Sequence, residues 1–211
     1  MEITWRDKTI TCEEGTTLFD ISKQVEKEYE FPIIVAKVDG VIQELYHEVI
    51  DGTTVSFCTT KDSDGKRAYI RGMSMLLLKA IQEEKAFKEE DRITIDFCLD
   101  SGYYCHLNSK EKPTKELIDR LEKRMREDVK KDIRFEKVVM RTRDARQMFE
   151  KKHMSDKSNL LKYRRNSRMT VYHLGDFTDY YYGAMPYSTG ILTHFRLELF
   201  EDGFVFVVPK K

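Results

Sequence analysis

Apolar and polar positions alternate at the start of the chain and then change to a helical spacing. Ile3–Trp5 and Thr9–Thr11 alternate on either side of a short polar turn, which predicts a β-hairpin. The next apolar positions lie three or four residues apart and predict a helix of about 12 residues: Leu18, Ile21, Val25 and Tyr29. Thr17 can cap this helix, Asp20 takes the capping-box position, and Pro32 ends it.

Three more strands are expected before residue 60. The apolar run 32–38 predicts a buried strand, Asp39-Gly40 predicts a hairpin turn, and 41–46 returns as the partner strand. Asp51-Gly52 marks another turn before a strand over 54–58. The order strand, strand, helix, strand, strand, strand predicts a ubiquitin-like β-grasp fold.

A polar, charged segment over 62–67 follows and predicts a linker between a domain at 1–61 and a second domain at 68–211. The second domain mixes both hydrophobic periods, so the whole chain is expected to be α+β. Expected helices span 71–87, 114–131, 142–152 and 155–165, and expected strands span 92–99, 103–107, 133–142, 169–175, 193–200 and 204–208.

The composition argues against several function classes. The 211 residues include 37 basic and 37 acidic ones, so overall charge indicates neither a nucleic-acid nor a membrane partner. No apolar run approaches the ~20 residues that span a bilayer, and no signal-peptide pattern opens the chain, so we expect a cytoplasmic protein. The four cysteines form no C-x-x-C pair, which favours buried thiols over a zinc site.

The segment Asp179–Gly190, DYYYGAMPYSTG, concentrates aromatic residues between two expected strands. A helix does not tolerate Gly183, Pro186 and Gly190 so close together, and a solvated loop does not carry so much aromatic surface. We expect a shaped, partly buried loop, and loops of this kind often hold binding residues.

Residues 1 to about 60 resemble the TGS domain. The resemblance lies in Gly15-Thr16-Thr17 at the helix start, the strand before Asp39-Gly40, and the late Asp51-Gly52. It implies a β-grasp fold and a small-ligand or RNA-binding module without catalysis. A spacer domain without a ligand remains an equal alternative.

The second domain resembles the second N-terminal domain of threonyl-tRNA synthetase, which is shared with alanyl-tRNA synthetase editing domains. The resemblance is carried by IDFCLDSGYYCHL, PTKELIDRLEKRMREDVKKD, VVMRTRDARQMFEKK and TDYYYGAMPYSTGILTHFRLELFEDGFVFV. It implies a His-x3-His pair and a Cys-x3-His pair that bind zinc or position water for ester hydrolysis. In this chain the four positions are Arg71, Met75, Tyr181 and Met185, none of which suits zinc. We therefore expect no metal and no metal-dependent editing.

An aromatic and thioether cleft with one guanidinium suits a planar or anionic ligand. The candidate pocket residues are Arg71, Met75, Asp179, Tyr181, Tyr182, Gly183, Met185, Tyr187, Ser188 and Thr189. A second interpretation stays open, in which the cleft has collapsed into a core filled by methionine and tyrosine.

The two domains together also look like the N-terminal half of a bacterial nucleoside kinase of the uridine kinase type. The carrying segments are Asp179–Gly183, Pro186–Gly190 and the ending Phe200–Pro209. The resemblance implies a P-loop kinase domain in the same parent chain, a transferase that uses ATP and magnesium. No G-x-x-x-x-G-K-[ST] motif occurs here, so this chain is expected to sense a ligand or contact RNA without a cofactor of its own. The alternatives are a synthetase-related editing hydrolase and a free-standing RNA-binding module.

Basic residues gather around Tyr163 and can follow an RNA backbone. The candidate RNA contacts are Lys162, Arg164, Arg165 and Arg168. A solvated charged face is the alternative.

Overall fold

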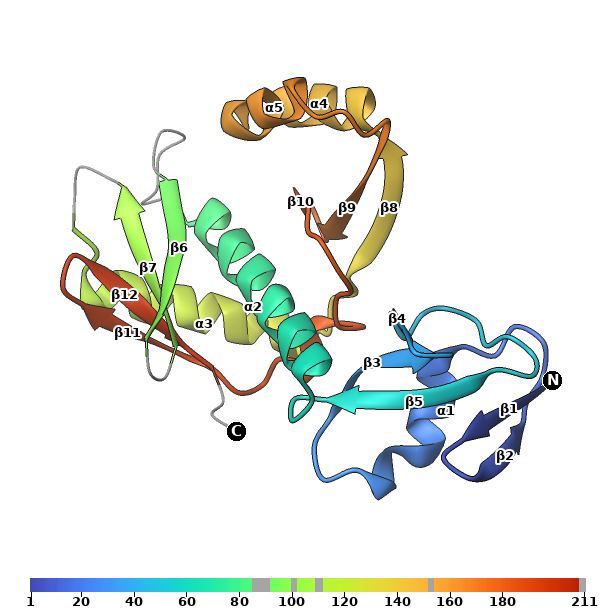
Figure 1. Ribbon diagram of the computed structural model, residues 1–211. Coiled ribbons are helices and arrows are strands. Elements are labelled where there is room, and N and C mark those ends of the chain that lie inside the picture. The colour runs from blue at the N-terminus through green and yellow to red at the C-terminus, as the bar shows by residue number, and fades with distance from the viewer. Residues whose placement is uncertain (85–91, 100–101, 109–111, 152–153, 209–211) are drawn as a thin grey trace.

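Three β-sheets organise the chain, each with its own helices, in a computed structural model (Figure 1). The structure describes residues 1–84, 92–99, 102–108, 112–151 and 154–208. Helices and strands both occur along the described chain, which confirms the predicted α+β class. None of the described helices is long and apolar enough to cross a membrane.

The first sheet is the predicted β-grasp. Its strands follow the order β2-β1-β5-β3-β4, in which β1 and β5 are parallel and the other neighbours antiparallel. The elements are β1 (Glu2–Trp5), β2 (Lys8–Thr11), α1 (Leu18–Val25), η1 (Glu26–Glu28), β3 (Ile33–Val38), β4 (Val41–Gln43) and β5 (Thr54–Thr59). The predicted capping box is present, because Asp20 N donates to Thr17 Oγ1 at 3.2 Å and Thr17 N donates to the Asp20 carboxylate at 2.9 Å.

The expected linker over 62–67 is helical instead. Helix α2 (Ser63–Glu83) begins directly after Asp62, and Lys66 N already donates to Asp62 O at 2.8 Å. Gly65 within this segment serves close packing, because a Cβ on it would lie 2.0 Å from the Thr59 carbonyl oxygen. The division of the chain into domains at this point stays a prediction.

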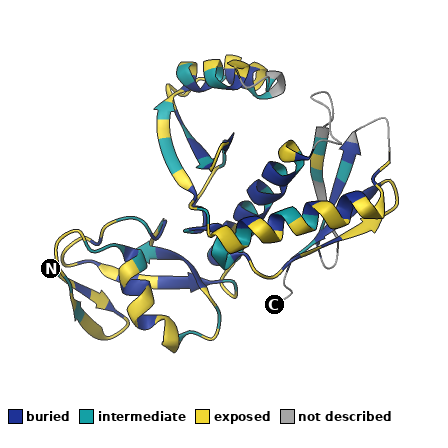
Figure 2. Ribbon diagram, turned by 180° about the vertical axis from the view of Figure 1, so that it is seen from behind, coloured by how far each residue is buried: buried dark blue, intermediate teal, exposed yellow. Residues whose placement is uncertain are grey.

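The second sheet is antiparallel and follows the order β11-β12-β7-β6. Its strands are β6 (Arg92–Leu99), β7 (Gly102–Asn108), β11 (Arg196–Phe200) and β12 (Gly203–Val207). Helix α2 packs against α3 (Lys115–Lys131), and Figure 2 shows α2 largely buried while α3 keeps an exposed face. The expected helix 71–87 starts earlier and ends at Glu83, and its last three residues lie outside the described part.

The third sheet was not expected as a separate unit. Its strands follow the order β10-β9-β8, with β8 (Glu136–Arg141), β9 (Arg168–Leu174) and β10 (Phe177–Asp179). Helices α4 (Thr142–Lys151) and α5 (Ser155–Lys162) accompany it, and a short turn η2 (Thr189–Ile191) follows. This unit, the arm of Figure 1, has its own small core formed by Ala145, Phe149, Leu161, Met169 and Val171.

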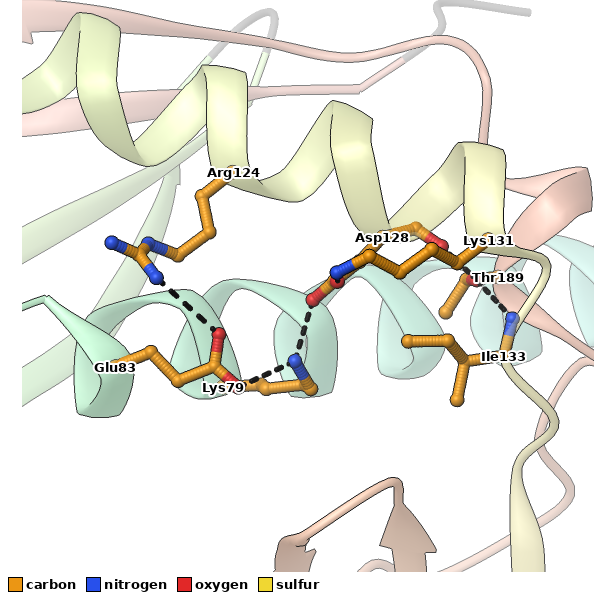
Figure 3. Close-up of polar contacts among 7 residues, drawn as sticks. All are labelled: Lys79, Glu83, Arg124, Asp128, Lys131, Ile133 and Thr189. Carbon is orange, nitrogen blue, oxygen red and sulfur yellow. Dashed lines mark hydrogen bonds and ion pairs between the residues drawn. The ribbon is translucent and has the colours of Figure 1, made fainter.

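A buried ion pair joins α2 to α3. Lys79 Nζ lies 2.6 Å from Asp128 Oδ2, and Figure 3 shows Lys79 reaching both Asp128 and Glu83. Burial opposes both charges, yet the hydrogen bonds between them outweigh it, so the pKa of Asp128 is lowered and that of Lys79 is raised. This pair fixes the position of α3 against α2.

We expect Asp128→Asn to lower the free energy of unfolding by about 2–3 kcal/mol, because it removes the buried counter-charge of the Lys79 ammonium and leaves only the partly exposed Glu83 as its partner. Urea titration at neutral pH measures this. Asp119→Asn, on the exposed face of the same helix, is the matched control. The double variant Lys79→Met/Asp128→Leu should recover most of the lost free energy of unfolding.

Because the pKa of Asp128 is lowered in the folded protein, its contribution to the free energy of unfolding is present above about pH 4 and is lost as the pH falls further. An Asp128→Asn protein as stable as Asp119→Asn would contradict this account.

Candidate functional site

A cleft of about 420 Å³ lies where the three units meet. Its walls come from the end of β4, from α2, from β8 and β9, and from the segment Tyr180–Ala184. Five basic side chains and two acidic ones line it: Arg67, Arg71, Lys137, Arg164, Arg168, Glu44 and Asp64. Four tyrosines line it as well: Tyr172, Tyr180, Tyr181 and Tyr182. The cleft is therefore positively charged and aromatic.

Glu44 joins the three units at the base of the cleft. Its side chain comes from the first unit and is only 2% exposed as a residue. The Tyr172 hydroxyl of β9 donates to it, Lys137 Nζ of β8 lies 2.9 Å away, and Met185 N donates to it at 3.4 Å. Burial, followed by the Glu44 carboxylate, raises the pKa of Tyr172, so the hydroxyl stays protonated and donates.

Arg71 holds the aromatic loop against α2. Its Nε and Nη2 atoms donate to the Ala184 carbonyl oxygen at 2.9 and 2.7 Å. Gly183 has a φ of +102°, and a Cβ there would lie 2.9 Å from the guanidinium carbon of Arg71. Only glycine permits this conformation and this approach together. Burial lowers the pKa of Arg71 from its ordinary value, but the group remains a cation near neutral pH.

The two methionines lie deeper than the cleft surface, whereas Tyr181 lines the cleft and has a buried hydroxyl. Met75 and Met185 are fully buried in the core that α2 shares with the second sheet, and neither lines the cleft. The Tyr181 hydroxyl is buried without a hydrogen-bond partner among the described residues, and burial raises its pKa well above the ordinary value. At these positions the structure matches a filled core, whereas the neighbouring cleft stays open.

The remaining pocket candidates make contacts within the fold. Asp179 is buried and pairs with Lys157 at 2.6 Å. Tyr187 stacks on Phe19 of the first unit, with ring centroids 3.9 Å apart. Ser188 is buried and pairs with Arg134 in an isolated β-bridge.

Thr189 links α3 to the start of the arm. Its hydroxyl donates to Asp128 O at 2.7 Å and accepts from Ile133 N at 2.8 Å (Figure 3). Both hydrogen-bonding roles of this buried hydroxyl are therefore occupied within the protein.

A second hollow of about 480 Å³ lies on the arm beside the cleft. Six basic side chains line it: Arg141, Arg143, Arg146, Lys162, Arg164 and Arg165. We call this second hollow the arm groove. Arg164 lines both the arm groove and the cleft, so the two form one continuous basic surface. Arg141, Arg143 and Arg146 have carboxylate partners.

The four predicted RNA contacts, Lys162, Arg164, Arg165 and Arg168, differ from their neighbours. Among the described residues, no carboxylate lies within ion-pair distance of any of them. Two exposed aromatic rings accompany them, Tyr163 at 80% and Tyr182 at 69% exposure. Arg164 Nη1 donates to the Tyr182 hydroxyl at 2.7 Å, and Lys162 Nζ lies 5.8 Å from the Tyr163 ring centroid.

The described residues contain no group of three or more His, Cys, Asp or Glu side chains that can hold a metal ion. Of the cysteines, Cys58 and Cys105 are buried and Cys12 is partly buried, while the Cys98 side chain lies outside the described part.

Several cleft residues were missed from sequence. Glu44, Lys137 and Tyr172 fall within expected strands, over 41–46, 133–142 and 169–175. Their role depends on contacts between segments more than 90 residues apart, such as Lys137 to Glu44 at a separation of 93. No local pattern carries that information.

We expect Glu44→Gln to lower the free energy of unfolding by about 2 kcal/mol, because it removes the charge that pairs with Lys137 and accepts from Tyr172. Glu48→Gln, at an exposed position in the same segment, is the matched control. Chemical denaturation of the two variants measures the difference. Equal stabilities would show that the buried carboxylate does not hold the units together.

No family model matches the sequence. A threonine–tRNA ligase of Clostridium kluyveri is 29% identical over 184 residues, 87% of this chain and 28% of that protein. A threonine–tRNA ligase of Caldanaerobacter subterraneus is 26% identical over 199 residues, 93% of this chain and 30% of that protein. The enzyme of the same name from Thermus thermophilus is also 26% identical over 199 residues, 90% of this chain and 30% of that protein.

These relatives correct the expected parent protein. They are threonine–tRNA ligases, so the predicted uridine-kinase-type nucleoside kinase, a transferase that binds ATP, is wrong. The kinase prediction relied on the tyrosine-rich loop and the final hairpin. The chain spans less than a third of the length of these three relatives, and over that stretch it is similar to threonine–tRNA ligases.

Proposed function

We propose that this chain is an RNA-contacting module related to threonine–tRNA ligases. It binds RNA and does not catalyse ester hydrolysis. The observation that carries the proposal is the unpaired basic cluster Lys162, Arg164, Arg165 and Arg168, which joins the arm groove to the cleft. The relatives support the ligand class, because their name states that they act on tRNA.

The electrostatics favour phosphate contact. In a chain of zero net charge, four neighbouring cations without carboxylate partners among the described residues create a local positive field. Protein cations that neutralise RNA phosphates release the counterions condensed on the RNA, so binding should weaken steeply as the salt concentration rises.

The exposed tyrosines favour unpaired nucleotides. Tyr163 and Tyr182 are both largely exposed; Tyr163 precedes Arg164 in the chain, and Tyr182 accepts a hydrogen bond from it. Bases can stack on such rings only where they are not already stacked within a duplex. We therefore infer a single-stranded segment as the ligand, with its backbone on the cations and its bases on the rings.

The geometry favours binding over metal-dependent hydrolysis. At the four positions that carry metal ligands in the resembling domain, Met75 and Met185 are buried, Tyr181 is a phenol, and Arg71 is committed to Ala184. None of these side chains supplies a nitrogen or sulfur ligand suited to zinc.

We expect Arg164→Ala to weaken binding of a fluorescein-labelled, single-stranded 12-nucleotide RNA by about tenfold at low salt, because it removes a cation shared by both hollows. Fluorescence anisotropy across a salt series measures the affinity, and the slope of log K against log salt should fall by about 0.7. Lys123→Ala, an exposed lysine of α3 outside both hollows, is the matched control. If Lys123→Ala and Arg164→Ala weaken binding equally, or the chain binds no RNA, the proposal fails.

Tyr163→Ala should weaken the same RNA by roughly tenfold, because stacking of one base contributes about 1–3 kcal/mol. Tyr163→Phe keeps the ring and should retain most of the affinity. A matched RNA duplex should be insensitive to both substitutions. Loss of affinity in Tyr163→Phe as large as in Tyr163→Ala would assign the effect to the hydroxyl and would contradict stacking.

A further inference from the structure

A third hollow, separate from the basic surface, lies where the first unit meets the beginning of α2. Its volume is about 130 Å³. The lining comes from five parts of the chain: the segment before β3, the residues after β5, one face of α2, the segment around η2, and the residue after β12. The apolar walls are formed by Phe31, Pro32, Tyr69, Ile70, Ile191 and Val208.

The basic side chains of this hollow, which we call the seam pocket, are Lys61, Lys66 and His194. None of the described residues that line it is acidic. Lys61 is occupied, since its Nζ lies 3.0 Å from Glu30 and 4.5 Å from the centroid of the Phe31 ring. Lys66 has no carboxylate partner among the described residues and is only half-exposed. An unneutralised ammonium therefore stands beside an apolar hollow.

Tyr69 gives the seam pocket a fixed wall. Its hydroxyl donates to His194 O at 3.1 Å and accepts from His194 N at 3.2 Å. Burial raises its pKa to about 12, so the hydroxyl keeps its proton near neutral pH. Both hydrogen-bonding roles of the hydroxyl are filled, and the ring presents an apolar face to a ligand.

We propose that the seam pocket binds a small monocarboxylate with a compact apolar body, with the body between Ile70, Ile191 and Tyr69 and the carboxylate on Lys66. Size supports this class, because a dry apolar cavity of about 150 Å³ is known to hold a benzene molecule. Charge supports it as well, since an ammonium without a counter-charge favours an anion and disfavours a cation. The proposal is independent of RNA contact.

Isothermal titration calorimetry of the full chain tests the assignment with phenylacetate and its uncharged analogue phenylacetamide. We expect phenylacetate to bind one site per chain, at least about tenfold tighter than phenylacetamide. Lys66→Met keeps an apolar stem but removes the charge, and should lower the phenylacetate affinity to that of the amide. Lys123→Met is the matched control and should leave both affinities unchanged.

A pocket-filling variant, Ile191→Trp, separates binding in the hollow from binding to the surface. It should abolish binding of both compounds while circular dichroism shows the fold intact. Equal affinity for acid and amide, or phenylacetate binding unaffected by Lys66→Met, would overturn the proposal. If phenylacetate fails to bind at millimolar concentration, the proposed ligand class is wrong. If Ile191→Trp converts a dimer into a monomer in sedimentation, the seam pocket holds a second copy and the proposal fails.

Discussion

The buried carboxylate of Glu44 is the contact on which the arrangement of the three units depends. It comes from the β-grasp unit, and it receives Tyr172 and Lys137 from the arm and Met185 N from the tyrosine-rich loop. A charge at 2% exposure is stable only where such partners converge on it. The loop Tyr180–Ala184 therefore has a defined position between α2 and β9. Arg71 fixes the same loop from the other side.

This arrangement explains why the segment Asp179–Gly190 is split between two roles. Its inner residues, Met185, Ser188 and Thr189, are buried and hold the core and the end of α3. Its outer residue Tyr182 faces solvent and meets Arg164 of the arm. This loop is therefore a packed support whose outer edge borders a basic surface. The chemistry that remains at this edge is that of cations and aromatic rings, which suits phosphates and bases.

Local periodicity was sufficient to predict the β-grasp unit, because glycines at 15, 40 and 52 mark its later turns and its helix carries its own cap at Thr17. Local periodicity failed where the role of a residue depends on a contact with a segment distant in sequence. The polar segment 62–67 predicted a linker, but α2 begins within it, and Gly65 lets this helix lie against the Thr59 carbonyl. The arm was missed as a separate unit because β10 has only three residues and its pairing with β9 is a tertiary feature. Glu44 falls in an ordinary expected strand, since nothing beside it in sequence reveals that Lys137 and Tyr172 converge there.

The predicted kinase parent protein was wrong because aromatic residues in one loop outweighed the order of elements along the chain, which is the feature shared with the synthetase resemblance.

Ultraviolet crosslinking of the full chain to a uridine-rich single-stranded RNA, followed by mass spectrometry, tests the central claim most directly. The account predicts crosslinked peptides that contain Tyr163 and Tyr182, because these are the exposed rings beside the unpaired cations. Crosslinks confined to the β-grasp unit or to the outer face of α3 would contradict it.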